Sequence, residues 1–182
     1  LETDEIQKAA WFLKRSAYVY FSGYSLVQNP QRNAILTAIE HAKKFNAKII
    51  FDPGAYNIIK SHKQLFHELL KFCDVLSLNL EEAKIIANKT NVKIAINRLS
   101  KIAPLTALKC DEQGSILITQ QKIVRIPGFK VKCLDPTGAG DAYTAALIYG
   151  LTHKLPLEAI GQLANWFAAQ VTTRFGPRTF PS

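Results

Sequence analysis

Asp135-Pro136-Thr137-Gly138-Ala139-Gly140-Asp141 is the stretch that decides the fold, because it leads directly into an apolar segment at about 139–151. Its two glycines allow a tight bend and let a ligand approach the backbone without obstruction by a Cβ. A helix that begins at this bend directs its free N–H groups and the positive end of its dipole toward the loop. The stretch therefore predicts an anion site, with the carboxylate of Asp141 in the first turn of the helix.

On both sides of this stretch, short apolar runs alternate with helical runs. The apolar runs predict strands at 18–21, 48–51, 74–78 and 105–108, and a hairpin of 115–119 against 122–126. The long connections between strands imply right-handed crossovers, and the continuous apolar character of the strands implies that both faces are covered. We therefore predict one α/β domain over residues 1–182, with a mostly parallel sheet, helices on both faces and a C-terminal antiparallel hairpin.

The helices are predicted from apolar residues at helical spacing. Thr3 is expected to cap the first helix, and Pro30 to open the second, which extends to about Phe45. The remaining helices are expected around 65–70 and at 80–87, 92–100, 139–151 and 157–174.

The composition restricts the class of protein. The chain has 182 residues, of which 48% are hydrophobic, and this fits one soluble globular domain. No apolar run approaches the roughly 18 residues needed to cross a bilayer, and acidic residues near the start replace the basic region of a signal peptide. Three cysteines without a CxxC pair disfavour a disulfide framework or a zinc site. A cytoplasmic location without membrane partners is therefore expected.

The net charge of +9 suits an anionic ligand, and it also suits nucleic acid. Because the lysines are scattered and no block of five basic residues occurs, we expect no nucleic-acid partner. A nucleic-acid-binding protein is retained as an alternative that the charge alone suggests. The chain contains no Met, even at position 1, so we expect it to be processed or to be a piece of a longer protein.

The anion site and its carboxylate suit phosphoryl transfer. The migrating phosphoryl group spreads negative charge over its oxygens, and a neighbouring carboxylate can accept the proton of an incoming hydroxyl. Asp135 and Thr137 have side chains that can orient the loop or bind a cation. The simpler alternative, a tight turn with an acidic first helical turn, stays open at this point.

The run DPTGAGDAY at 135–143 resembles the second signature of the PfkB, or ribokinase-like, carbohydrate kinases, whose usual form is DTxGAGDxF. The resemblance implies that Asp141 is the catalytic base and that the backbone of Gly138, Ala139 and Gly140 binds the transferring group. It also implies ATP-dependent phosphorylation of a hydroxyl of a sugar or nucleoside, with Mg²⁺. Pro136 replaces a threonine of the family, so any hydrogen bond from that amide is lost.

Two further segments resemble this family. Asn79-Leu80-Glu81-Glu82 is similar to its NxxE motif, which implies that Asn79 and Glu82 organise Mg²⁺, water and phosphate. The alternative is an ordinary helix N-cap with acidic residues in its first turn. The stretch 108–116 resembles the segment that borders the nucleotide, which implies that Lys109 and Gly114 line the nucleotide site. Lys109 replaces a threonine of the family, and Asp111 replaces a glycine and would repel phosphates unless it points away.

The last part of the chain resembles the adenine-side helix and closing loop of the family. By this resemblance Asn165 contacts the nucleotide, and a monovalent cation, expected to be K⁺, is bound by five residues: Asp135, Thr137, Val171, Arg174 and Gly176. The alternatives are a surface polar residue at 165 and a simple helix stop at Gly176-Pro177. Asp52-Pro53 also resembles a family feature, but we interpret Asp52 as a residue that ends a strand.

The resemblance extends from about Ser22-Gly23 to Phe180 and implies a ribokinase-like fold without the N-terminal segment of the family. That segment, roughly 100 residues or more, carries acceptor-binding residues and a β-sheet lid, in keeping with ordinary domain sizes. The acceptor therefore cannot be read from this sequence, and a homodimer formed through the lid stays open. A catalytically inactive, kinase-like subunit with a structural or regulatory role is the alternative function.

Overall fold

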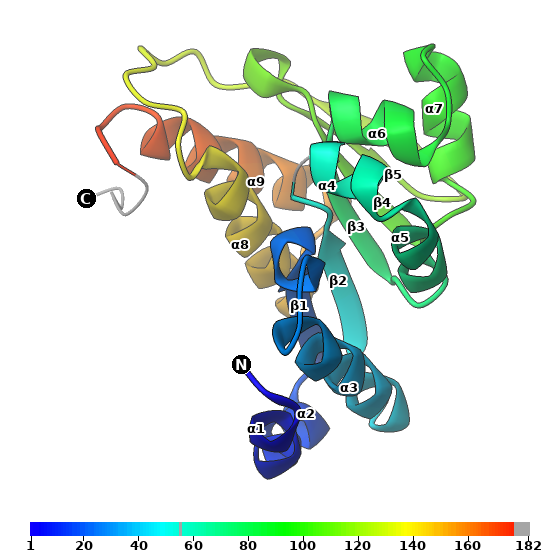
Figure 1. Cartoon of the computed structure of the whole chain (residues 1–182). Coiled ribbons are helices and arrows are strands. Elements are labelled where there is room, and N and C mark those ends of the chain that lie inside the picture. The colour runs from blue at the N-terminus through cyan, green and yellow to red at the C-terminus, as the bar shows by residue number, and fades with distance from the viewer. Residues whose placement is uncertain (55, 177–182) are drawn as a thin grey trace. The chain divides into compact units, whose positions relative to one another are not determined.

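The computed structural model describes residues 1–54 and 56–176. Pro177 and Phe180, to which the sequence predictions extended, lie outside the described residues. The strands form one six-stranded sheet in the order β1-β2-β3-β4-β5-β6 (Figure 1). Their bounds are β1 Tyr18–Ser22, β2 Lys48–Asp52, β3 Val75–Asn79, β4 Leu105–Lys109, β5 Ser115–Ile118 and β6 Ile123–Ile126.

The pairing of the strands agrees with the predicted fold class. β1 pairs with β2, and β2 with β3, in parallel, whereas β5 and β6 form the antiparallel hairpin. The helices are α1 Thr3–Lys8, α2 Ala10–Arg15, α3 Gln31–Lys44, α4 Tyr56–Ser61, α5 Lys63–Leu70, α6 Leu80–Ile86, α7 Val92–Leu99, α8 Ala139–Thr152 and α9 Leu157–Val171. The α/β fold with a mostly parallel sheet and a terminal hairpin is therefore confirmed.

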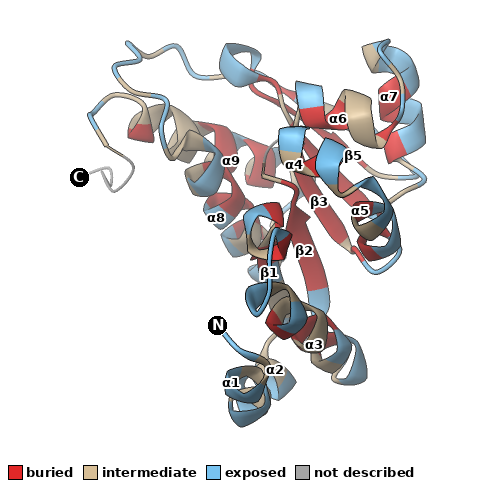
Figure 2. Cartoon of the chain, in the orientation of Figure 1, coloured by how far each residue is buried: buried red, intermediate tan, exposed pale blue. Residues whose placement is uncertain are grey.

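Contacts divide the chain into two compact units, Leu1–Thr106 and the residues from Ala107 onward. In the first unit, α3 packs on β1 and β2, and α6 packs on β3. The apolar residues of β2 and β3 are buried, and Figure 2 shows these strands largely in red. Phe51 stacks on Phe21 with ring centroids 4.7 Å apart and meets Phe66 at 5.4 Å. Burial on both faces explains why these strands read as continuous apolar runs.

In the second unit, α8 and α9 pack against each other, and α9 packs on β5 and β6. The packing is close because glycines face bulky side chains. A Cβ on Gly150 would lie 2.8 Å from Ile160, and one on Gly161 would lie 2.6 Å from Ile126. Leu147 in the middle of α8 has no exposed surface. This packing holds α8, whose first turn carries Asp141, against α9.

The start of the chain differs from the prediction. The first helix is interrupted at Ala9 and forms two short helices, α1 and α2. Thr3 lies inside α1, and Glu2 occupies the cap, where its backbone N–H donates to the Glu5 carboxylate at 2.7 Å. An acidic side chain three residues inside the helix thus replaces the expected threonine cap. The helix α4 was not predicted, because it is only 6 residues long.

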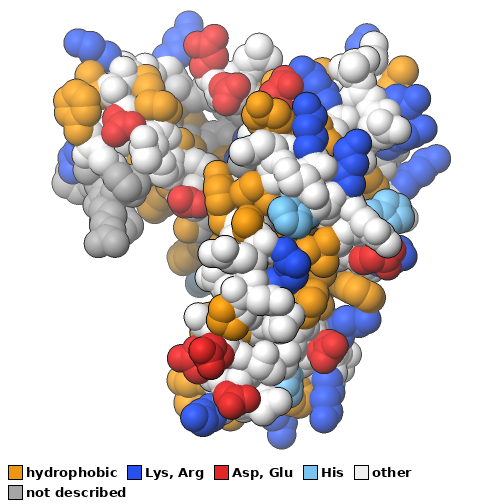
Figure 3. All heavy atoms as spheres, in the orientation of Figure 1, with side chains coloured by type: hydrophobic (Ala, Val, Ile, Leu, Met, Phe, Trp, Pro, Cys, Tyr) orange, Lys and Arg blue, Asp and Glu red, His pale blue; other side chains and the backbone are white. Residues whose placement is uncertain are grey.

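The basic side chains do not gather in one place on the face that Figure 3 shows, where acidic and hydrophobic side chains lie among them. Several lysines pair with nearby carboxylates: Lys71 with Glu68 at 2.6 Å, Lys84 with Glu81 at 2.5 Å and Lys122 with Glu158 at 3.2 Å. None of the helices within the described ranges has the length and apolar character needed to cross a membrane.

Candidate functional site

The turn before α8 has the geometry of an open helix N-terminus. Gly138 caps the helix with φ 85° and ψ −6°, a left-handed conformation that suits a residue without a Cβ. No described side chain makes a capping hydrogen bond here. Asp141 lies in the first turn, as predicted, and its side chain is exposed. The carboxylate therefore lies at the end of the helix that attracts negative charge.

Two backbone amides in the first turn of α8 are available to a ligand. The N–H of Ala139 donates to the carbonyl of Pro136 at 3.2 Å, so the turn itself uses it. The N–H groups of Gly140 and Asp141 have no acceptor in the described part of the chain. A Cβ added to Gly140 would meet nothing nearer than the Lys109 Nζ, 3.7 Å away. The structure thus leaves the amides of Gly140 and Asp141 open to an anion, whereas the turn itself uses the amide of Ala139.

Asp135 ties the loop before α8 to the segment after α9. Its Oδ1 accepts from the Thr137 N–H at 2.9 Å, and its Oδ2 accepts from the Gly176 N–H at 2.9 Å. The backbone N–H groups of Leu134 and Asp135 both donate to the Thr172 carbonyl, at 2.7 and 3.2 Å. Hydrogen bonds from the side chain of Thr137 and from the backbone of Gly176 and Thr137 hold the pKa of Asp135 below its ordinary value. The loop is therefore fixed by bonds to the ionised carboxylate.

These contacts bring together three of the five residues predicted to bind a monovalent cation, namely Asp135, Thr137 and Gly176. Val171 is buried at the end of α9, and Arg174 is exposed in the turn that follows. A carboxylate with two oxygens, each of which has a further lone pair, fits a cation that takes oxygen ligands.

The loop between β4 and β5 is shaped by two residues with positive φ. Gly114 has φ 95°, and a Cβ there would lie 2.2 Å from the Ile126 carbonyl, so no other residue fits. Asp111 has φ 50°, and its side chain is exposed. Asp111 therefore adopts a left-handed conformation that glycine would adopt at lower cost. Lys109, the last residue of β4, is half-buried.

Asn165 is a buried residue of α9 with 5% of its surface exposed. Its side-chain Nδ2 donates to the carbonyls of Ile126 and Pro127, at 3.2 and 3.0 Å. The alternative of a surface polar residue is therefore wrong. The amide fastens α9 to the end of β6, and a contact with nucleotide stays a prediction for this residue.

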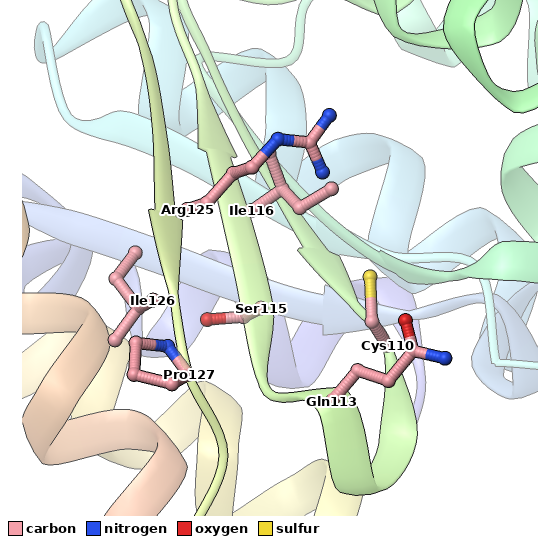
Figure 4. A pocket seen from close by; sticks show the side chains of 7 residues that line it. All are labelled: Cys110, Gln113, Ser115, Ile116, Arg125, Ile126 and Pro127. Carbon is pink, nitrogen blue, oxygen red and sulfur yellow. The ribbon is translucent and has the colours of Figure 1, made fainter.

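A cavity of about 260 Å³ lies beside the hairpin (Figure 4). Figure 4 shows Ser115 between Ile126 and Pro127 on one side and Cys110 and Gln113 on the other. The remaining lining residues are Ile116 and Arg125. Burial raises the pKa of Tyr143 to about 12, and the Ser115 hydroxyl next to it opposes this shift. The cavity is thus adjacent to the loop that carries Gly114.

In the first unit, Asn79 and Glu82 form a closed helix N-terminus after β3. The Asn79 Oδ1 accepts from the Glu82 N–H at 2.9 Å, and the Glu82 carboxylate accepts from the Asn79 N–H at 2.9 Å and from its side-chain Nδ2 at 3.0 Å. Glu82 is only 1% exposed. The capping alternative therefore describes the local structure, and a role toward Mg²⁺ stays a prediction.

Asp52 at the end of β2 also has its carboxylate engaged. Its Oδ1 accepts from the Gly54 N–H at 3.0 Å, and its Oδ2 accepts from the Ser77 hydroxyl at 3.3 Å. Among the described residues, no three His, Cys, Asp or Glu side chains lie close enough together to hold a metal ion.

The pattern of the pfkB family carbohydrate kinases matches residues 1–182. The chain belongs to this family. This pfkB family chain is 26% identical over 182 residues to the 5-dehydro-2-deoxygluconokinase of Bacillus subtilis. The match covers 96% of this chain and 55% of the relative. The chain thus spans about half the length of the curated relatives it matches. The resemblance inferred from the GAGD motif is confirmed.

Solved structures of kinases have the same fold as this pfkB family chain. The adenosine kinase of Sinorhizobium meliloti superposes with a TM-score of 0.91 at 26% identity, over 95% of this chain and 54% of that one. An Escherichia coli protein assigned as ribokinase II, solved with ATP and Mg²⁺, gives 0.86 at 23% identity, over 92% and 56%. A Vibrio cholerae fructokinase variant with fructose, ADP and a potassium ion gives 0.79 at 22%, over 91% and 57%. The last two likenesses show the fold alone.

Sequence reasoning missed the contacts that hold the site in shape. The bond from Gly176 to Asp135 joins residues 41 apart, and the bonds from Asn165 reach back 38 and 39 residues. No local sequence pattern predicts hydrogen-bond partners at such separations. The one available signal was chemical: an Asn in an otherwise apolar helix needs hydrogen-bond partners when it is buried.

Proposed function

We propose that this chain is the nucleotide-binding and catalytic part of a kinase that transfers the γ-phosphoryl group of ATP to a hydroxyl of a sugar or nucleoside. The observation that carries the proposal is the open N-terminus of α8, where the amides of Gly140 and Asp141 have no acceptor in the described chain and the Asp141 carboxylate lies in the same turn. Family membership supports it, because the pattern that matches is that of carbohydrate kinases.

In this proposal each group at the turn has one task. The two open amides hold oxygens of the migrating phosphoryl group, where preorganised donors stabilise developing charge. Asp141 accepts the proton of the attacking hydroxyl as the bond to phosphorus forms. The Asp135 carboxylate keeps the loop in place through its bonds to Thr137 and Gly176. Mg²⁺, when bound with ATP, neutralises charge on the phosphates.

The other proposed contacts follow from the resemblance. Asn79 and Glu82 would serve Mg²⁺ and its water, Gly114 and Asn165 would border the nucleotide, and K⁺ would bind near Asp135. The K⁺ proposal has a direct test, because a ligand of the folded state raises the melting temperature. We expect a higher melting temperature in KCl than in equimolar tetramethylammonium chloride, and no such difference in Asp135→Asn. Equal melting in both salts would contradict the cation site.

The test of the nucleotide site is ATP binding to the 182-residue chain, measured by calorimetry in the presence of Mg²⁺. We expect Gly140→Val to abolish binding, because its branched side chain would cover the two amides. Ala145→Val is the matched control, since Ala145 is an exposed position of the same helix. Equal ATP affinity in the wild-type chain and Gly140→Val would refute the proposed anion site.

The acceptor is tested with a panel drawn from the relatives: 5-dehydro-2-deoxygluconate, adenosine and fructose. The protein is the natural full-length chain that contains these residues, compared with its Asp141→Asn variant. The competing proposal is an inactive subunit, which the lack of an N–H at Pro136 favours. ATP binding without turnover above the variant on any acceptor would support the inactive subunit and exclude the catalytic role.

A further inference from the structure

We propose that the first unit has a separate anion site, which binds a phosphate monoester in a cavity between the start of α3 and the start of α5. The cavity has a volume of about 400 Å³ and is lined by Arg32 of α3, the run 61–65 and Glu68 of α5. Its size is within the range of about 300–1,000 Å³ that small-molecule sites occupy. All of these residues lie outside the motifs from which the kinase site was derived, so the inference does not depend on the proposed function.

Arg32 places a fixed positive charge at this cavity. Its side chain is half-buried, and its Nε donates to the Leu26 carbonyl at 2.6 Å while its Nη2 donates to the Val27 carbonyl. Both acceptors are neutral, so the bonds orient the guanidinium and leave its charge uncompensated. A guanidinium has five N–H donors in a planar fork, and the donors that these bonds do not use can bind phosphate oxygens.

Lys63 and His62 add to the positive character of the cavity. Lys63 is exposed, and within the described residues neither Lys63 nor Arg32 forms an ion pair with a carboxylate. The Nδ1 of His62 lies 3.3 Å from the Ile58 carbonyl, which can only accept, so Nδ1 carries a hydrogen and Nε2 is left for a ligand. The cavity therefore offers an anion two full positive charges.

Glu68 is the one carboxylate among the lining residues, and its charge is already compensated. Its Oε2 lies 2.6 Å from the Lys71 Nζ, and its Oε1 lies 3.9 Å from the Nδ1 of His67. The hydrogen bond and the charge of Lys71 hold the pKa of Glu68 below its ordinary value. Because Glu68 pairs with a lysine that does not line the cavity, the charges of Arg32 and Lys63 remain in excess there.

The charge and the size of the cavity together select the class of ligand. A phosphate monoester carries about two negative charges at neutral pH, which match the two cations. The cavity is larger than one phosphate group fills, and Leu65 and the aliphatic stem of Lys63 supply apolar surface beside the charges. A monoester whose phosphate meets Arg32 and whose organic part covers Leu65 uses both features.

The experiment is a titration of the isotope-labelled 182-residue chain with phenyl phosphate, followed through the amide signals by NMR. Signals of residues 61–65 report this cavity, whereas those of Gly140 and Asp141 report the first turn of α8, so the two sites are measured separately. We expect saturable shifts at 61–65 and tighter binding of phenyl phosphate than of inorganic phosphate. Shifts that sodium chloride reproduces at equal ionic strength would overturn the site, and equal dissociation constants for the two phosphates would overturn the assignment to an ester.

Three variants separate charge from folding. Lys63→Met removes an exposed charge and should weaken binding at 61–65 about 3–10-fold. Arg32→Met should weaken it about 10–100-fold, the range for hydrogen bonds to a charged group. Lys93→Met makes the same change at an exposed position of α7 and should leave the dissociation constant unchanged. If Arg32→Met does not fold, because its bonds to two backbone carbonyls are lost, Lys63→Met keeps the test decisive.

The outcomes distinguish a ligand site from a structural role of Arg32. If Arg32 only secures the backbone at Leu26 and Val27, Arg32→Met loses stability while Lys63→Met binds phenyl phosphate like the wild type, and the site is overturned. A loss of affinity in Lys63→Met with Lys93→Met unaffected supports the site. Because the signal of Gly140 is read separately, failure at 61–65 leaves the proposed kinase function standing.

Discussion

The N-termini of α6 and α8 differ in whether side chains of the protein form hydrogen bonds with the backbone of the first helical turn. At α6, the side chains of Asn79 and Glu82 satisfy the backbone of the first turn, and Glu82 is almost completely buried. At α8, a glycine takes the cap, and the amides of Gly140 and Asp141 have no acceptor in the described chain. A capped N-terminus stabilises the folded protein through its side-chain hydrogen bonds. An uncapped N-terminus lacks this stabilisation, and its backbone N–H groups can instead donate to a ligand. The comparison predicts that changes at α6 affect folding and that changes at α8 affect function.

Asp141→Asn should have the largest effect on the open turn. The amide side chain keeps the shape of the carboxylate but cannot accept a proton, so turnover should fall about 10²–10⁴-fold. ATP affinity should not fall, because a negative charge near the phosphates is removed. The measurement is steady-state turnover with the natural full-length protein, together with ATP calorimetry. Turnover within threefold of wild type would exclude Asp141 as the base.

Asn79→Ala should have the next largest effect, and the effect should be on stability. The loss of the side-chain cap should lower the free energy of unfolding by about 1–2 kcal/mol, as for other N-caps. Urea unfolding of the 182-residue chain provides the measurement. Asn97→Ala is a suitable control because Asn97 is an exposed asparagine within α7. A cost no larger than that of the control would remove the distinction between the closed and open turns.

Gly138→Ala should have a smaller effect that comes from the backbone. At φ 85° an alanine carries the strain of a left-handed residue, about 1 kcal/mol. Gly138→Asn should cost less, because asparagine tolerates this conformation. Urea unfolding of both variants tests the order. If alanine and asparagine are equally tolerated, the cap is not held in the left-handed conformation.

Asp135→Asn should have the smallest effect at neutral pH and a clear effect on acid stability. Because the folded-state pKa of Asp135 lies below its ordinary value, its contribution is present above the ordinary pKa and is lost as the pH falls through the folded-state pKa. The wild-type chain should therefore lose stability below about pH 4 more steeply than the variant. Melting temperatures between pH 6 and pH 3 test this. Glu112→Gln, a change at an exposed carboxylate of the same unit, should keep the wild-type slope.

The sequence predicted the local features of the fold and of the site, because periodicity and special residues report local conditions. The apolar runs at 48–51 and 74–78 identified buried strands, and the glycines at 138 and 140 identified the tight bend before α8, where Gly138 proves to be left-handed. The break at Ala9 was missed, since the apolar stripe of the first helix continues through it. The use of the Ala139 N–H by the turn was also missed, because the Pro136 carbonyl accepts it only once the turn has folded. Hydrogen bonds between residues far apart in sequence, such as Asp135 and Gly176, depend on the tertiary fold and cannot be predicted from a local pattern.

The order of the strands has a consequence for how the chain is made. β1, β2 and β3 pair as neighbours in the same order in which they are synthesised. Each strand can therefore join the previous one while later residues are still being added, without a gap left for a strand that comes afterwards. In a growing polypeptide of this kind, unpaired strand groups are confined to the two outer edges of the sheet, which limits the surface through which unfinished chains can associate.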